Sequence, residues 1–480
     1  MTNFIIPEIN IISVLPEIIL LAMGTAFLFI RKLSSKLPWL LSFLSIITTL
    51  CLSIILPAFW NMKITGFGGA IVWDNLSLVF YCLILAAVFL AIVFSRDYLK
   101  SEESSGEYYC LMLLASAGMM LMVTARDLLI VFLGMEILSV SLYILVGFSR
   151  KLPEGMEASV KYFLIGSFSS AVFLMGLAFV YGASGQTKFD SFYPAVIALV
   201  NMPPVFYVGI ILIIAGLGFK IAAAPFHMWA PDTYEGAPAI VAALLSVAPK
   251  VAAFAVIYHL GLLMYLFTTD IFIAVIIIMS VASMVIGNFA ALKQSNLIRM
   301  LAYSGIAQIG YILISLLALS QGGGSAMLFY LFVYTFMNMG AFGIAVLITK
   351  ENGRKISIDD LAGLASRRPL LAFAMSVFMI SLAGIPPTGG FFAKFYVFKL
   401  GLEAGYLWVV IVAIIATIVS LYYYFRVIVL MYMREKEEGQ LRTPEKGFSL
   451  LPAVLVACAF LLLLFGIISE YLLNISMNVL

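Results

Sequence analysis

The sequence is poor in charged residues. Only 11% of its 480 residues are charged and 64% are hydrophobic, whereas a soluble globular chain is about one quarter charged and about half apolar. The mean hydropathy of +1.13 shows the same bias. The net charge of +3 and the lack of a long basic run argue against a nucleic-acid partner. The composition therefore predicts an integral membrane protein.

Cysteine and histidine are also scarce, which limits the possible metal and redox chemistry. Four cysteines stand singly in apolar runs: Cys51, Cys82, Cys110 and Cys458. With no CxxC and no Cys/His cluster, iron–sulfur and zinc sites are not expected. The two histidines, His227 and His259, are a poor set for a bis-histidine haem. No P-loop, GxGxxG or Ser/His/Asp grouping is present either, so we expect no cofactor and no metal in this chain.

Long apolar runs, by contrast, recur along the whole sequence, and a spanning helix needs about 20 such residues. Fourteen runs qualify: 11–30, 38–58, 71–95, 107–125, 128–149, 158–182, 204–226, 237–264, 270–292, 298–319, 325–349, 369–399, 404–431 and 448–474. The first run has no small-residue cleavage pattern and is not expected to be a cleavable signal. The stretches around 225–240 and 384–391 contain proline and glycine, so these helices are predicted to be broken. The fold class is therefore all-α, a polytopic membrane protein with about fourteen transmembrane helices.

The distribution of lysine and arginine predicts the orientation. With residue 1 outside, 18 of the 27 basic residues fall in the inner loops, which include 350–368 and 434–446, and 4 fall in the outer loops. Basic residues favour cytoplasmic loops. Both termini are therefore predicted to lie on the non-cytoplasmic side.

The other five basic residues lie within predicted spans: Lys161, Lys220, Lys250, Lys394 and Arg426. One acid, Glu136, lies ten residues after Arg126 and fourteen before Arg150, about 15 Å and about 21 Å along a helix. It is therefore near mid-membrane. A charge at the bilayer centre costs at least about 2.5–3.5 kcal/mol, so such residues usually face the protein interior and have a function.

Two interpretations of these charges stand beside each other. Glu136 and Lys220 could form a structural ion pair that locks two helices, because an unpaired buried ion is costly. One acid cannot pair with three mid-membrane lysines, however. A lysine without a counter-charge in a low dielectric gives up its proton more readily, which favours a proton relay.

Prolines lie beside each of these lysines. Pro225 follows Lys220 by five residues, Pro249 directly precedes Lys250, and Pro386-Pro387 come shortly before Lys394. A single proline usually makes a kink. Three such sites next to three lysines predict broken helices at mid-depth, which are typical of transporter sites.

Two further residues have less specific readings. Lys161 is near the inner end of its helix and could belong to the relay or anchor the helix by snorkelling. His227, seven residues after Lys220, could continue a proton path or make a structural hydrogen bond.

Four long motifs carry a resemblance to a known family. They cover residues 216–238 (GLGFK through PFHMWAPDTYEGAP), 244–250 (LLSVAPK), 300–305 (MLAYSG) and 382–395 (LAGIPPTGGFFAKF). The sequence resembles the antiporter-like subunits of respiratory complex I, and the subunit N type most closely. The resemblance covers nearly the whole chain.

The resemblance implies an internal architecture and a set of site residues. Two inverted five-helix repeats, helices 4–8 (107–264) and 9–13 (265–431), follow helices 1–3 (1–106) and precede an inner loop with helix 14 (432–480). Helices 7 and 12 are the broken ones. The positions of the family's proton relay fall on Glu136, Lys220, Lys250 and Lys394. Gln308 stands where many relatives have histidine, so a water is expected to link the central and exit lysines there.

The resemblance also implies the function. The chain is expected to be a membrane-arm subunit of an NADH–quinone oxidoreductase in a bacterial inner membrane, translocating protons while other subunits transfer electrons from NADH to quinone. NAD, FMN, iron–sulfur clusters and quinone are expected in those partner subunits. The alternative is a subunit of an Mrp-type cation/proton antiporter. A passive scaffold of helices is the rival from another class, and the intramembrane lysines argue against it.

Overall fold

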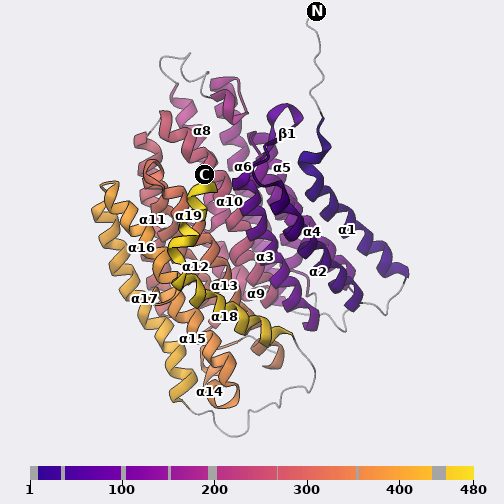
Figure 1. Cartoon of the computed structure of the whole chain (residues 1–480), viewed down its shortest axis with the longest axis vertical. Helices are drawn as coiled ribbons and strands as arrows, with labels where there is room; N and C mark the ends of the chain where they lie inside the picture. Colours follow the sequence, from indigo (N-terminus) through magenta and orange to yellow (C-terminus); the bar gives the residue numbers. More distant parts are fainter. Residues whose placement is uncertain are drawn as a thin grey trace, which may run out of the picture.

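The structure is a computed structural model that describes residues 9–33, 38–98, 104–149, 153–192, 203–267, 269–352, 356–434 and 450–479. It is an elongated bundle of long helices that run side by side (Figure 1). The first half contains α1 (Leu15–Leu33), α2 (Pro38–Ile55), α3 (Asn75–Tyr98), α4 (Ser105–Thr124), α5 (Leu128–Val146), α6 (Pro153–Ser184), α8 (Pro204–Ile221), α9 (Trp229–Gly236) and α10 (Ala239–Phe267). The second half contains α11 (Thr269–Leu292), α12 (Leu297–Ile314), α13 (Gly323–Asn352), α14 (Leu364–Arg367), α15 (Pro369–Ala383), α16 (Gly389–Glu403), α17 (Leu407–Met433), α18 (Leu451–Ile467) and α19 (Ser469–Val479).

Short elements join these helices. Five 3-10 turns cover Ile11–Val14, Leu56–Phe59, Phe67–Gly69, Ser315–Gln321 and Ile358–Leu361. A small antiparallel hairpin of β1 (Ile64–Gly66) and β2 (Ile71–Trp73), which the sequence did not predict, lies between α2 and α3. Beside it, Arg126 donates its backbone N–H to Ala70 O and pairs with Asp74 at 2.7 Å.

The helices are long and apolar enough for a membrane. Within the described residues, 12 helices could span it, or 13 if the bent pair α18–α19 is one span. The prediction of a polytopic all-α membrane protein is confirmed. The count of fourteen stays a prediction, because it treats α15 and α16 as one span. Each of them has 15 residues, about 22 Å of helix, and the hydrocarbon core is about 30 Å thick.

The last predicted helix is wrong in one respect. Instead of one helix over 448–474, α18 and α19 meet at a bend of 82°. Residues after the bend are more polar and include Ser469, Glu470 and Asn474. Such a segment gains less from burial in hydrocarbon, so the helix changes direction where the apolar run ends.

Two of the three proline sites are true breaks, as predicted. After α8, Ala222 adopts a left-handed conformation with φ +56°, and after α15, Gly384 does so with φ +80°. Both residues end their helices, since a left-handed residue is a common helix terminator.

The predicted break at Pro249 is wrong, because α10 continues through it. A proline leaves the carbonyl four residues earlier without its helical donor. Here that carbonyl, Leu245 O, accepts a hydrogen bond from the Tyr234 hydroxyl at 3.0 Å. A tyrosine from α9 thus satisfies the freed group, and the helix continues.

Candidate functional site: buried lysines along the bundle

The three mid-membrane lysines are all buried. Lys220 in the last turn of α8 is 3% exposed, Lys250 in α10 is 1% exposed, and Lys394 in α16 is 4% exposed. Among the described residues, none of the three forms an ion pair within 4.0 Å of a carboxylate. Their nearest polar partners are hydroxyl groups for Lys220 and Lys250 and backbone carbonyl groups for Lys394. A hydroxyl group can pass a proton on, whereas a backbone carbonyl only accepts a hydrogen bond.

The first cluster surrounds Lys220 and differs from the expected ion pair. Lys220 Nζ donates to Ser139 Oγ at 2.6 Å. Glu136, one turn earlier on α5, is only partly buried and accepts a hydrogen bond from Ser170 of α6. The direct Glu136–Lys220 pair is therefore not formed. The reason is geometric, since Ser139 lies one turn further along α5 and receives the ammonium group.

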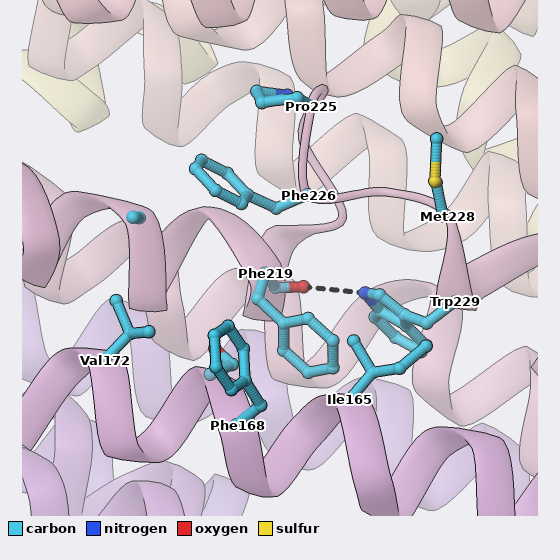
Figure 2. A pocket seen from close by; sticks show the side chains of 10 residues that line it. Ile165, Phe168, Val172, Phe219, Pro225, Phe226, Met228 and Trp229 are labelled. Atoms are coloured by element: carbon cyan, nitrogen blue, oxygen red, sulfur yellow. Dashed lines mark hydrogen bonds between the residues drawn. The ribbon is translucent and has the colours of Figure 1, made fainter.

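The end of α8 is closed by the next short helix (Figure 2). Trp229, the first residue of α9, donates its indole Nε1–H to Phe219 O at 3.0 Å. Its ring stacks on Tyr162 of α6, with the centroids 4.6 Å apart. Phe219 directly precedes Lys220, so a side chain from beyond the break holds the turn that carries the lysine.

An apolar cavity of about 280 Å³ lies beside this indole. Ile165, Phe168 and Val172 of α6 line one side of the cavity. Phe226 and Met228, from the segment between α8 and α9, line the other side (Figure 2). The lining offers almost no polar surface, so the cavity is no part of a proton path.

The central cluster surrounds Lys250. Lys250 Nζ lies 3.4 Å from Tyr334 Oη of α13, and Tyr334 donates to Ser246 O at 3.0 Å. Asn338 donates to both Ser246 Oγ and Tyr334 Oη, at 2.8 and 3.2 Å. Gly305 of α12 makes room for the amine, because a Cβ there would lie 3.2 Å from Nζ.

The third cluster is centred on Gln308 of α12, which is 1% exposed. Its Oε1 accepts from the Tyr330 hydroxyl, and its Nε2 donates to Leu382 O at 2.9 Å and to Tyr424 Oη at 3.2 Å. Tyr424 also shares a 2.5 Å hydrogen bond with Ser304. The amide side chain thus connects α12, α13, α15 and α17 where a water-mediated link was expected.

Lys394 lies beside the second break, between α15 and α16. Its Nζ donates to Leu382 O at 3.0 Å and to Ala383 O at 3.1 Å. It also lies 4.7 Å from the centre of the Tyr311 ring. Among the described residues, no direct hydrogen bond joins the Lys250 cluster to the Gln308 cluster. They meet at α12, where Gly305 faces Lys250 and its neighbour Ser304 binds Tyr424.

Among the described residues, the two less specific candidates make no side-chain hydrogen bond to Lys220, Lys250 or Lys394. His227 is 7% exposed, lies in the break, and its Nδ1 is buried without a hydrogen-bond partner among the described residues. Lys161 pairs with Glu157 at 2.7 Å and with Asp232 at 3.7 Å, and its side chain is 47% exposed. This position fits an anchoring role for Lys161, while a relay role stays a prediction.

Four hydroxyl residues of the site were not predicted from the sequence. Ser139 and Tyr334 contact lysines, and Tyr330 and Tyr424 contact Gln308. Tyrosine and serine are common in membrane spans, so only the three-dimensional arrangement identifies these four. In the described residues, no group of three or more His, Cys, Asp or Glu side chains is arranged to hold a metal ion.

Comparisons with known proteins place the chain. Residues 125–420 match the family described as NADH:quinone oxidoreductase/Mrp antiporter, TM. A protein of Trichlorobacter lovleyi named NADH-quinone oxidoreductase subunit N is 42% identical over 433 residues, covering 90% of this chain and 89% of that protein. The chain belongs to the NADH-quinone oxidoreductase subunit N family. A second member of the subunit N family, from Koribacter versatilis, is 40% identical over 489 residues and covers 99% of this chain and 98% of its own length.

Chains of solved respiratory and antiporter complexes share the fold. A chain of respiratory complex I from Thermus thermophilus superposes with a TM-score of 0.80 and 30% identity, covering 96% of this chain and 98% of that one. A chain of the archaeal membrane-bound sulfane sulfur reductase superposes with a TM-score of 0.83 and 25% identity, covering 97% and 96%. A chain of the Mrp complex from Dietzia, at 21% identity and a TM-score of 0.84 over 98% and 97% of the two chains, shares the fold.

Proposed function

We propose that this chain is a membrane-arm subunit of an NADH–quinone oxidoreductase and moves protons across the membrane through Lys220, Lys250, Gln308 and Lys394. One observation carries the proposal. Three buried lysines lie without a carboxylate in ion-pair contact among the described residues. A charge so placed is costly, and a charged residue inside a membrane span therefore usually has a function.

Hydrogen bonds mark only parts of the route, and water has to join these parts. Lys220 donates to Ser139, which itself donates to Met135 O. A proton on Lys220 therefore reaches Glu136 on α5, or Lys250 on α10, through water. From Lys250 it passes by Tyr334 to α12, and one bridging water completes the step to Tyr424. Gln308 then aligns the path towards Lys394, from which the proton leaves.

The two broken helices support a two-fold internal design. Both α8 and α15 end in a left-handed residue, and each break has a buried lysine beside it. We infer that 107–264 and 265–431 are the two inverted repeats that the resemblance implies. Helix breaks that place charged groups at mid-depth are how transporters of this kind build their sites.

Electron transfer is assigned to other subunits. The sequence offers no motif for a flavin, an iron–sulfur cluster or a nucleotide, so NAD, FMN, the clusters and quinone belong to partner chains. The redox reaction then perturbs the Glu136–Lys220 region through the membrane arm. Moving one charge against 100 mV takes about 2.3 kcal/mol, which making and breaking a buried charge contact can supply.

Purification from native membranes tests the assignment. We expect the chain to be recovered with soluble redox subunits and other membrane subunits, and the assembled complex to pump protons in vesicles when NADH and quinone are supplied. The isolated chain should not oxidise NADH. Recovery only with cation-antiporter subunits, together with sodium-dependent proton exchange and no NADH oxidation, would establish the Mrp alternative instead.

A further inference from the structure

The short helix α9 is linked both to α12 and to α8. Arg299 of α12 contacts two carboxylates of α9, Asp232 in the middle of the helix and Glu235 near its C-terminal end. Its Nη1 lies 2.6 Å from Asp232 Oδ1 and 2.9 Å from Glu235 Oε2. Hydrogen bonds between a guanidinium and a carboxylate are among the strong ones in proteins, so Arg299 fixes α9 to α12.

At its N-terminal end, α9 holds α8. The Trp229 indole donates to Phe219 O at 3.0 Å, and Phe219 is in the last turn of α8 (Figure 2). The ring is 3% exposed and lies against Tyr162 and Phe219, with centroids 4.6 and 5.0 Å away. A buried, stacked indole has little freedom, so a displacement of α9 moves the carbonyl that it binds.

That carbonyl belongs to the residue before Lys220. The last carbonyls of a helix lack the usual helical donors, so a helix end frays unless other groups satisfy them. Phe219 O accepts two hydrogen bonds, one from the Ala222 N–H of the turn itself and one from the Trp229 indole, both at 3.0 Å. The indole is the donor that comes from another helix. Fraying here would move the Lys220 amine relative to Ser139 of α5, which it contacts at 2.6 Å. Proton transfer depends on such distances to a few tenths of an ångström.

We propose that Arg299 is a positioning residue for proton transfer at Lys220, acting through α9 and the Trp229 indole. This inference rests on the proposed function. Arg299 touches none of the lysines, and its side chain is 28% exposed. A role confined to a surface ion pair would make it dispensable, since exposed pairs contribute little.

The same helix α12 reaches the other two lysine sites. Gly305 lies against Lys250, and Gln308 donates to Leu382 O beside Lys394. Arg299 therefore anchors to α9 the helix that contacts both later clusters. Arg299→Gln loosens this contact without removing a group of the proposed proton route.

The first experiment measures position and needs no proton pumping. Hydrogen–deuterium exchange is followed in 229–236 of the assembled complex, for wild type, Arg299→Gln and the milder Asp232→Asn. We expect exchange in α9 to rise by at least about threefold in Arg299→Gln, because local opening sets this rate. Lys399→Gln is the matched control, as it removes an exposed pair with Glu403 at 3.8 Å and should leave α9 unchanged. Unchanged exchange of α9 in both Arg299→Gln and Asp232→Asn would overturn the proposal.

The second experiment measures protons pumped per NADH oxidised, normalised to assembled complex. Trp229→Phe keeps the stacked ring and removes the N–H. We expect Arg299→Gln and Trp229→Phe each to lower this ratio. The double variant should pump within about twofold of the less active single variant, because the effects of residues that act through one another are not additive. Multiplying losses in the double variant would show that Arg299 does not act through Trp229.

The two measurements distinguish a failure of the proposed function from a failure of the proposed role of Arg299. Faster exchange in α9 with no proton pumping even in the wild-type complex would contradict the proposed function and leave the mechanical link intact. Full pumping in Arg299→Gln despite faster exchange would overturn its role as a positioning residue.

Discussion

Gln308 and Lys394 donate to the same carbonyl oxygen. Gln308 Nε2 lies 2.9 Å and Lys394 Nζ 3.0 Å from Leu382 O. Leu382 is next to last in α15. Its carbonyl has no helical N–H donor because the helix ends there, so it can accept from these two side chains. The C-terminal end of a helix favours a cation, so the end of α15 stabilises the lysine where no carboxylate does. The break after α15 therefore contributes a hydrogen-bond acceptor to the site in addition to positioning Lys394.

The strongest test of the relay concerns Lys250. Lys250→Met keeps the length of the side chain and removes the titrating group, while Lys250→Arg keeps a charge that does not release its proton. We expect both variants to assemble and both to lower proton pumping by at least about tenfold, since a positioned proton-transfer group contributes about 10²–10⁴-fold. Pumping in vesicles, normalised to assembled complex, measures this. A structural charge would behave differently, and full pumping in Lys250→Arg would exclude the relay role of this residue.

A second prediction concerns Gly305, which leaves room for the Lys250 amine. In Gly305→Ala the new methyl group would lie 3.2 Å from Lys250 Nζ and 3.1 Å from Tyr334 Oη. This crowding should cost about 1–3 kcal/mol and push the amine away from the tyrosine, so we expect pumping to fall several-fold. The control is Gly182→Ala on α6, where a Cβ would meet no atom within 4 Å. Equal activity of the two variants would show that the Lys250–Tyr334 contact is not on the path.

The Gln308 cluster gives a third prediction. Gln308→Leu removes every hydrogen bond of the side chain. The buried Tyr330 hydroxyl loses its acceptor, at about 1–3 kcal/mol, while Leu382 O keeps the hydrogen bond from Lys394. We expect pumping to fall by about tenfold. Gln308→His offers a donor and an acceptor at the same place and should keep pumping within about threefold of wild type. If leucine pumps as well as histidine does, the path does not pass this residue.

The orientation in the membrane is a fourth prediction. Single cysteines at Asp359 and Gln186, both exposed, are compared in intact cells with an impermeant thiol reagent. The charge distribution predicts that Gln186→Cys reacts from outside and Asp359→Cys only after the membrane is opened. Cysteines are introduced into a background in which Cys51, the exposed one of the four, is serine. Reaction of Asp359→Cys in sealed cells would show that the predicted topology is inverted or that the predicted number of helices is wrong.

The sequence alone determined the class of the protein and the identity of its lysines. Burial in lipid has a one-dimensional signal, because about 20 apolar residues are needed whatever the neighbours are. A charge inside such a run is conspicuous for the same reason, and so Glu136, Lys220, Lys250 and Lys394 stood out. The breaks after Lys220 and before Lys394 were visible as proline and glycine.

Only the tertiary structure decided what these residues contact. The sequence leaves open whether Lys220 pairs with Glu136 or belongs to a relay, and in the structure Lys220 donates to Ser139, one turn after Glu136 on α5. It suggested a break at Pro249, and Tyr234, 15 residues away along the chain, satisfies the freed carbonyl. Hydrogen bonds between helices depend on how those helices are rotated and offset, which hydropathy does not encode. The contacts of the tyrosines beside Lys250 and Gln308, and of the arginine beside α9, are therefore decided by packing.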